Sequence, residues 1–168
     1  MNYDINDLIQ KNANPAEVLF QLWSILSTVP YTVLYHEEQV VLNAWNFDST
    51  YGNGINDLIT NENYAVISRG LAAIGVLNVE RLNLWKHSIE AVLGRYGLDC
   101  NSEEDLVRIE RLTIDRRKTL AAELDDAESD FLNDIWDRGI ILTSLLSYIK
   151  ANMNVFLNRK TIELAFTV

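Results

Sequence analysis

Apolar residues recur at intervals of three and four along most of this chain, which is the spacing of one buried face of an α-helix. The first clear stripe begins after Asn14-Pro15 and ends before Pro30. Asparagine is a favoured N-cap and proline suits the first helical position, so we expect a helix to begin there. The stripe consists of Val18, Leu19, Leu22, Ile25, Leu26 and Val29. This pattern predicts an all-α fold.

Further helices are predicted by the same spacing and by capping residues at their ends. The turn Tyr51-Gly52-Asn53-Gly54 is rich in residues that tolerate positive φ, and Ser102 opens a segment that resembles a capping box. The tail, Thr161 to Val168, alternates weakly and is compatible with strand, helix or coil. We predict one domain, residues 1–168, of six to eight helices with at most a short terminal strand. Besides the first stripe, the expected helices are about Tyr35 to Phe47, a short one ending at Ile59, about Asn63 to Ile74 before a Gly75 cap, Asn78 to Tyr96, one after Ser102 and Ile140 to about Asn152.

The acidic segment Glu123 to Asp137 holds seven carboxylates and no lysine or arginine, in a chain of net charge −10. If it is helical, five of the seven acids line one face, and apolar residues line a neighbouring face that can be buried. The segment forms a helix of its own if Asp125 or Asp126 serves as the N-cap. The five aligned acids are Glu123, Asp126, Asp130, Asp134 and Asp137.

Successive turns of a helix are about 5.4 Å apart along the axis, close to the charge spacing of a nucleic-acid strand. Like charges four residues apart cost about 0.2–0.5 kcal/mol per pair, so a row of them is either a tolerated solvated face or a functional surface. Both interpretations stay open here. If the surface is functional, we expect Glu103 and Glu104 to extend it toward a basic protein partner.

Composition narrows the functional classes. A sequence pI of about 4.6 argues against direct nucleic-acid binding and favours basic partners. The first eleven residues lack the apolar run of a signal peptide, and no apolar stretch is long enough to span a bilayer. A single cysteine permits no internal disulfide and is consistent with a reducing compartment. We therefore expect a cytoplasmic protein without membrane contact.

The sequence contains no clear motif for catalysis or cofactor binding. His36-Glu37-Glu38 lacks the second histidine of a zinc-protease helix, and Cys100 has no histidine nearby in sequence to act as its base. Gly52-x-Gly54 is not followed by the lysine and hydroxyl residue of a phosphate loop. We predict no catalytic residue, no cofactor and no metal site.

Several short motifs resemble a family of small bacterial proteins. They are the run Thr50 to Asn61, TYGNGINDLITN, the run Gly70 to Gly75, GLAAIG, and the later elements Leu124-Asp125-Asp126, Phe131 and Leu145 to Ile149. The similarity spans about Glu37 to Asn152. The family is mostly of unknown function and includes a DNA-mimic protein. The resemblance implies an acidic all-helical homodimer that occupies the DNA-binding surface of a helix-turn-helix transcription factor.

This chain departs from the family pattern at three positions. Ser49 stands where the family usually has glutamate, Asn53 replaces a glycine, and Ile55 replaces a phenylalanine. A turn that packs against the core is compatible with these changes, whereas chemistry that needs the glutamate is not. The matched positions therefore indicate the fold better than the activity.

Three functional hypotheses remain. The first is an acidic interaction protein, in its specific form a DNA mimic, and the second is a toxin-neutralising immunity protein. The third is an enzyme or small-ligand binder with a polar pocket near Asn53, Asn56, Asp57 and Asn61. A homodimer is also expected, from the family resemblance and because one helix stripe would not bury all of Ile140, Ile141, Leu145 and Leu146. The alternative is a central core helix wrapped by the others.

Overall fold

In a computed structural model of the chain, residues 5–11, 14–52, 54–131 and 139–157 are described, and within them the secondary structure is entirely helical. The all-α class is therefore confirmed. The described residues form ten α-helices, more than the six to eight expected, because short helices at both ends were not predicted separately. The α-helices are α1 Ile5–Lys11, α2 Pro15–Leu26, α3 His36–Thr50, α4 Ile55–Thr60, α5 Tyr64–Val76, α6 Glu80–Arg95, α7 Glu103–Val107, α8 Ile114–Phe131, α9 Ile140–Ala151 and α10 Met153–Leu157, with two 3₁₀ helices, η1 Tyr31–Val33 and η2 Arg108–Arg111. The tail from Thr161 to Val168 lies outside the described residues.

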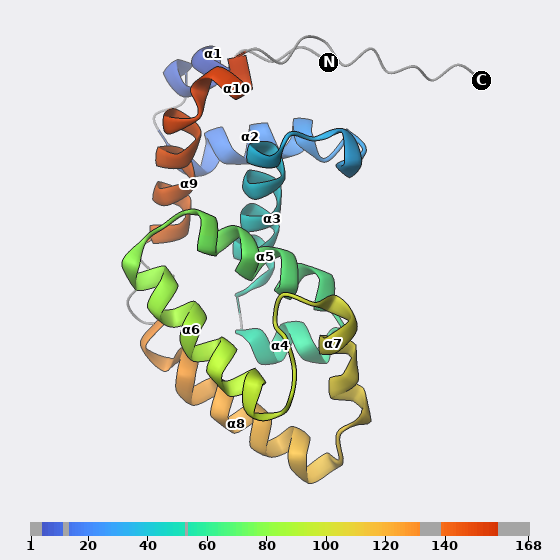
Figure 1. Cartoon of the computed structure of the whole chain (residues 1–168). Helices are drawn as coiled ribbons and strands as arrows, with labels where there is room; N and C mark the ends of the chain where they lie inside the picture. The colour runs from blue at the N-terminus through green and yellow to red at the C-terminus, as the bar shows by residue number, and fades with distance from the viewer. Residues whose placement is uncertain (1–4, 12–13, 53, 132–138, 158–168) are drawn as a thin grey trace, which may run out of the picture.

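Helices α3 and α5 pack against each other in the middle of the molecule and join its two ends (Figure 1). At one end, the first and last helices meet, with α9 against α2 and α10 against α1. At the other end, α8 packs along α6 and contacts α4, while α7 lies against α5. The middle of the sequence therefore forms the end of the molecule that carries the acidic helix.

Two predicted caps are present with the expected geometry. The Asn14 side-chain Oδ1 accepts a hydrogen bond from the Ala16 N–H at 3.0 Å, at the start of α2. The Ser102 Oγ accepts from the Asp105 N–H at 3.2 Å, at the start of α7. Each bond satisfies a backbone donor that the first helical turn leaves without an internal partner.

Three predicted helix boundaries were wrong. Gly75 lies inside α5 and does not cap it, because the helix continues to Val76. Asn78 does not open α6; it adopts a positive φ of 52° in the connection, and Val79 is the N-cap. The acidic segment does not begin a helix of its own at Asp125 or Asp126, since α8 runs without a break from Ile114 to Phe131.

The centre of the core is an aromatic cluster of Phe47, Tyr51 and Trp85, with ring centroids 5.0 to 5.9 Å apart. Gly70 allows the close approach of α5 to α3, because a Cβ at this position would lie 2.5 Å from the Phe47 side chain. This explains the packing role of the glycine in the GLAAIG run. Tyr51 directly follows α3, so the aromatic cluster lies beside the turn that precedes α4.

Helix α9 is largely covered within the chain. Ile141 and Leu145 are fully buried, and α9 packs against α2, α3 and α10. Ile140 is half-buried against the same core. Ile140, Ile141 and Leu145 therefore have an intrachain explanation, and the homodimer stays a prediction that these three residues do not require.

Candidate functional site

Helix α8 has two faces of opposite character. Leu120, Leu124 and Glu128 are spaced four residues apart and are buried against the neighbouring helices. On the other side, Asp125 and Asp126 are exposed. One helix thus carries both a buried carboxylate and exposed ones.

The predicted acidic row is only partly available for a partner. Glu123 is bound by Arg95, whose Nη2 and Nε donate to Glu123 Oε2 at 2.6 and 3.0 Å, and the Tyr96 hydroxyl donates to Oε1 at 3.3 Å. Asp126 is exposed and makes no ion pair within the part of the chain that the structure describes. Asp134 and Asp137 lie outside the described residues, as does the side chain of Asp130.

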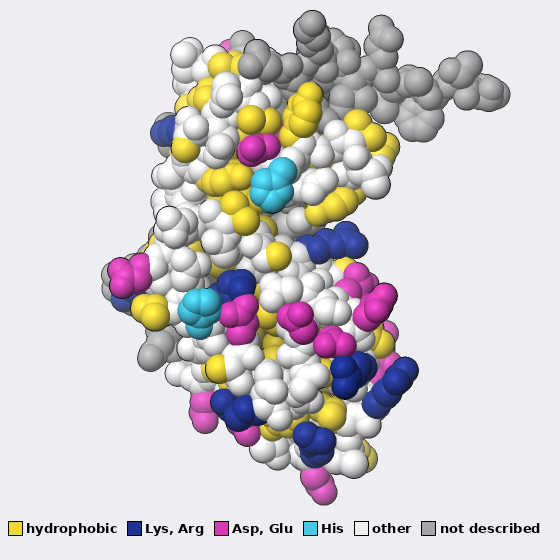
Figure 2. Space-filling model, in the orientation of Figure 1, with side chains coloured by type: hydrophobic (Ala, Val, Ile, Leu, Met, Phe, Trp, Pro, Cys, Tyr) yellow, Lys and Arg dark blue, Asp and Glu magenta, His cyan; other side chains and the backbone are white. Residues whose placement is uncertain are grey.

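Glu103 and Glu104 lie on α7, apart from the acidic half of α8. Helix α7 packs beside α5, whereas the acidic half of α8 lies along α6 (Figure 1). Glu103 is 3.8 Å from Arg69, and both side chains are half exposed. Figure 2 shows acidic side chains gathered over α6 and α7, with lysine and arginine side chains close beside them. The structure therefore separates these two glutamates from the row that they were expected to extend.

Helix α8 carries its consecutive bases and its exposed acids in different halves. Arg116, Arg117 and Lys118 stand in the first half, after Asp115 in the first turn. Asp125 and Asp126 are exposed in the second half, and no basic residue follows Lys118 within the described part of the helix. The residues one turn from Asp126 include Glu123 and Asp130 and no base, so α8 itself supplies no ion-pair partner for Asp126.

Glu128 belongs to the acidic segment but was not predicted as a site residue. Its Oε1 accepts hydrogen bonds from the Tyr51 hydroxyl at 2.7 Å and from the Ile55 N–H at 2.9 Å, and its Oε2 is 3.1 Å from the same N–H. A Cβ on Gly54, whose φ is +93°, would lie 2.7 Å from Oε2. Glu128 therefore fastens α8 to the turn before α4, and glycine is what lets the carboxylate approach.

Burial raises the pKa of Glu128 to about 7, although the hydrogen bonds from Tyr51 and Ile55 favour the ionised form. The nearby Asp125 charge adds to the increase. A sequence signal for this role did exist, since Glu128 continues the buried spacing of Leu120 and Leu124. A carboxylate at a position of the apolar stripe is buried, so the core must supply hydrogen-bond donors for it.

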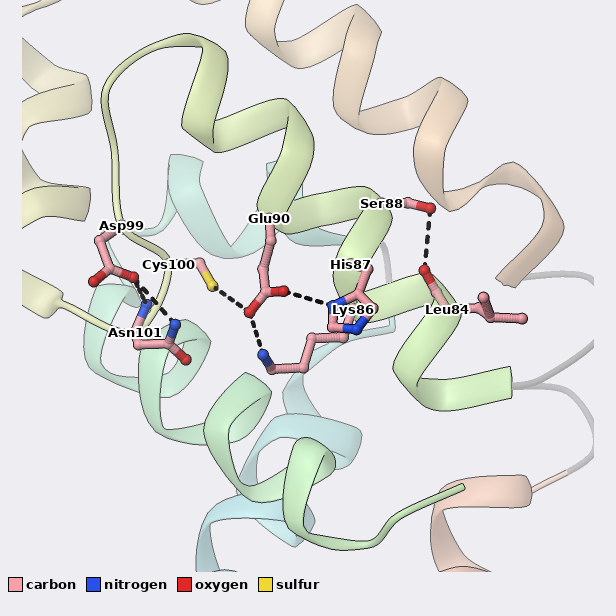
Figure 3. A network of polar contacts seen from close by, with 8 residues as sticks. All are labelled: Leu84, Lys86, His87, Ser88, Glu90, Asp99, Cys100 and Asn101. Atoms are coloured by element: carbon pink, nitrogen blue, oxygen red, sulfur yellow. Dashed lines mark hydrogen bonds and ion pairs between the residues drawn. The ribbon is translucent and has the colours of Figure 1, made fainter. Parts of the chain in front are cut away.

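A second polar network joins α6 to the loop that follows it (Figure 3). Glu90 accepts from Lys86 Nζ, contacts His87 Nδ1 at 2.8 Å and lies 3.6 Å from the Cys100 Sγ. Burial alone would raise the pKa of Glu90, but the bonds from Lys86 and His87 outweigh it and the pKa is lowered. The network therefore holds an ionised carboxylate between a lysine and a thiol.

Cys100 is a poor candidate nucleophile in this environment. Its side chain is buried, and burial together with the Glu90 charge raises the pKa of the thiol to about 12. His87 is on the far side of Glu90 and is mostly exposed, and His36 is exposed at the start of α3. The thiol therefore lacks the positioned base that nucleophilic catalysis requires.

Of the four residues expected to form a polar pocket, the structure places Asn56 in the lining of one. Asn56 and Thr60 line a pocket of about 420 Å³ between α4, η2 and α8, but Asp57 and Asn61 do not line it. Asn53 lies outside the described residues. Asn56 also donates to the Ala121 carbonyl at 2.7 Å and to Asp125 Oδ1 at 2.5 Å, so this side chain ties α4 to α8.

The described ranges contain neither a metal-binding cluster nor a membrane-spanning helix. Among these residues, no group of three or more histidine, cysteine, aspartate or glutamate side chains is arranged to hold a metal ion. No helix in the same part of the chain is both long and apolar enough to cross a membrane.

Comparison of the chain with family models, with curated proteins and with solved structures found no match in any of the three. The resemblance to the DNA-mimic family therefore rests on the short motifs quoted above.

Proposed function

We propose that this protein is a non-enzymatic acidic interaction protein, and that the outer face of the second half of α8 binds a basic protein in place of DNA. The contact residues would be Asp126 and Asp130, followed along the chain by Asp134 and Asp137. In this proposal the carboxylates take the place of phosphates against lysine and arginine side chains of a DNA-binding protein such as a helix-turn-helix transcription factor. The protein would act in the cytoplasm, as a homodimer.

The exposed carboxylate of Asp126 is the observation that carries this proposal. Asp126 forms no ion pair with any described residue and has the acids Glu123 and Asp130 one turn away on the same helix. Like charges at this spacing repel, so these acids do not stabilise one another. Binding of a basic partner would account for their presence.

Asp126 and Asp130 are four residues apart, so both lie on one face of the helix, about 6 Å apart along its axis, and can meet neighbouring cations of a partner together. Glu123, one turn earlier, is already neutralised by Arg95, and the contact surface therefore begins after it. A single exposed ion pair contributes only about 0–1 kcal/mol, so affinity depends on several carboxylates acting together. Long-range attraction adds mainly to the association rate and is weakened by salt.

The experiment is affinity capture from a lysate of the source organism at low salt, followed by measurement of the captured partner's affinity over a salt series. The test variant combines Asp126→Asn and Asp130→Asn, which keep side-chain shape and remove two charges. We expect it to bind more weakly, to associate more slowly and to show a shallower salt dependence. Equal affinity and an equal salt slope in the variant and the parent would overturn the proposal.

The matched control removes the same charge elsewhere, through Asp115→Asn at the other end of α8 and Glu17→Gln on α2. Both side chains are exposed. This control separates a local contact from the effect of net charge alone, since both double variants have a net charge less negative by two. DNA competition then specifies the function: a mimic is displaced by duplex DNA carrying the partner's site. If the captured partner is instead a toxin, if the protein abolishes its activity, and if DNA does not compete for binding, the protein is an immunity protein.

A further inference from the structure

The pocket between α4, η2 and α8 combines an apolar floor with charges of both signs at its rim. Ile59, Ile109 and Leu120 contribute apolar side chains, and Ile114 also lines the pocket while remaining 65% exposed. Its volume of about 420 Å³ lies in the range of small-molecule sites, about 300–1,000 Å³. The shape and lining therefore suit a compact molecule with an apolar body.

Two cations at this pocket have no ion-pair partner among the described residues. Arg117 and Lys118 both line it, and neither forms a salt bridge or side-chain hydrogen bond with any described residue. By contrast, Arg95 binds Glu123 and Lys86 binds Glu90. In a chain with 24 acidic and 14 basic residues, two adjacent bases without acidic partners leave room for an anion from outside.

The charge of Arg117 reaches the wall of the pocket. Tyr64 is buried there, and burial together with the Glu110 charge raises the pKa of its hydroxyl, while Arg117 acts in the opposite direction. Arg117 is therefore close enough to influence a pocket side chain although it makes no direct bond to one. A carboxylate bound beside Arg117 and Lys118 would complete their interactions.

The acidic rim limits the charge of the ligand. Glu62 and Glu110 also line the pocket, and they repel a second negative charge on any bound molecule. The net charge of −10 acts against polyanions in the same direction. A phosphate ester or a nucleic acid is therefore disfavoured relative to a ligand with a single negative charge.

We propose that this pocket binds a small amphipathic monocarboxylate, with Arg117 and Lys118 holding the carboxylate and Ile59, Ile109 and Leu120 covering the apolar body. Asn56 and Thr60 supply polar groups at the same wall. This binding activity is independent of the partner surface proposed above, because it uses the basic first half of α8 and the face toward α4.

The test is titration of the full chain, labelled at its isoleucine methyl groups, by nuclear magnetic resonance. The probes are hexanoate, its neutral counterpart hexanamide, acetate and inorganic phosphate. We expect hexanoate to shift the Ile59 and Ile109 methyl signals saturably, and hexanamide to bind about tenfold more weakly because it lacks the charge. Acetate lacks the apolar body and phosphate carries too much charge, so neither should shift these signals.

The test variant combines Arg117→Gln and Lys118→Gln, and the matched control is Arg116→Gln. Arg116 is the adjacent base, but its guanidinium lies over the Tyr96 ring, 5.4 Å from the centroid, and it does not line the pocket. We expect the double variant to lose about tenfold or more in hexanoate affinity and the control to keep it. A thermal unfolding curve for each variant confirms that the chain remains folded.

Three results would overturn the proposal: no saturable shift with hexanoate, equal binding of hexanoate and hexanamide, or unchanged affinity in the double variant. Failure here leaves the acidic-surface proposal untouched, since Asp126→Asn with Asp130→Asn should not alter hexanoate binding. Equal binding of the amide would reassign the pocket as a purely apolar cavity.

Discussion

The inner and outer faces of α8 use the same chemical group for different purposes. Glu128, on the inner face, is buried and accepts hydrogen bonds from Tyr51 and Ile55 on the turn before α4. Asp126, two residues earlier, is exposed and has no ion-pair partner among the described residues. One run of acids in the sequence therefore contains both a buried carboxylate that holds two elements together and an exposed one without an ion-pair partner among the described residues.

The cost of removing each class differs because of what is left behind. Deleting a buried acceptor leaves its donors without partners, at about 1–3 kcal/mol for each group. Removing an exposed acid leaves no buried donor without a partner, because water occupies the place of the carboxylate. The predictions below use this contrast.

The largest effect is expected for Glu128→Ala. It removes the Glu128 carboxylate that accepts from the buried Tyr51 hydroxyl and Ile55 N–H, so the free energy of unfolding should fall by about 2–6 kcal/mol. Glu128→Gln keeps an acceptor oxygen for both donors and should cost much less. Urea unfolding followed by circular dichroism measures both, and similar losses in the two variants would show that these hydrogen bonds do not hold the turn.

The next largest effect is expected for Gly54→Ala. The substitution forces an alanine to a φ of +93° and places its Cβ 2.7 Å from Glu128 Oε2, so it should destabilise the protein by about 2–5 kcal/mol. Gly52 is the internal control in the same turn, because its φ is not positive and a Cβ there meets no atom within 4 Å. Gly52→Ala should change the free energy of unfolding by less than about 1 kcal/mol. Equal losses would mean that the turn, and not the approach of Glu128, is what demands glycine.

Stability should also depend on pH through Glu128. Its pKa in the folded protein is raised from 4.5 to about 7, so the folded state holds this proton more tightly than the unfolded chain does. The resulting stabilisation, up to about 3 kcal/mol, is full below pH 4.5 and is lost as the pH rises through about 7. Asp48, whose pKa burial raises to about 6, acts in the same direction.

Unfolding measured from pH 5 to pH 8 checks this prediction, with Glu128→Gln as the comparison. The glutamine variant cannot titrate and should show a flatter profile over the same range. Parallel profiles for the two proteins would assign the pH dependence to other groups.

Much of the fold could be predicted from local patterns. The first helix stripe began at Pro15 as expected, and Ser102 caps α7, because these signals act over a few residues and are visible in the sequence. Gly75 and Asn78 misled because tertiary packing, which a local pattern does not contain, set the helix ends. The continuity of α8 through Asp125 was missed for the same reason.

The candidate site was less predictable because its key contacts join distant segments. Arg95 and Glu123 are 28 residues apart, and Tyr51 and Glu128 are 77 apart, so their pairing depends on how the helices pack. The 3.6-residue period correctly placed Asp126 outward. The same period also places Glu128 inward, because Glu128 continues the stripe of Leu120 and Leu124. Assigning each acid to a helical face individually would have revealed this.

The smallest effect on stability is expected for the variant that should matter most for binding, Asp126→Asn with Asp130→Asn. Asp126 is exposed, and substitutions at exposed positions usually change stability by no more than about 0.5 kcal/mol. The sign should favour the variant, because removing two negative charges from a run of acids lowers the repulsion among those that remain. Urea unfolding at low salt, where these terms are largest, should show an equal or slightly higher midpoint for the variant. A loss above about 1 kcal/mol would show that these acids have structural partners, and the outer face of α8 would then resemble its inner face.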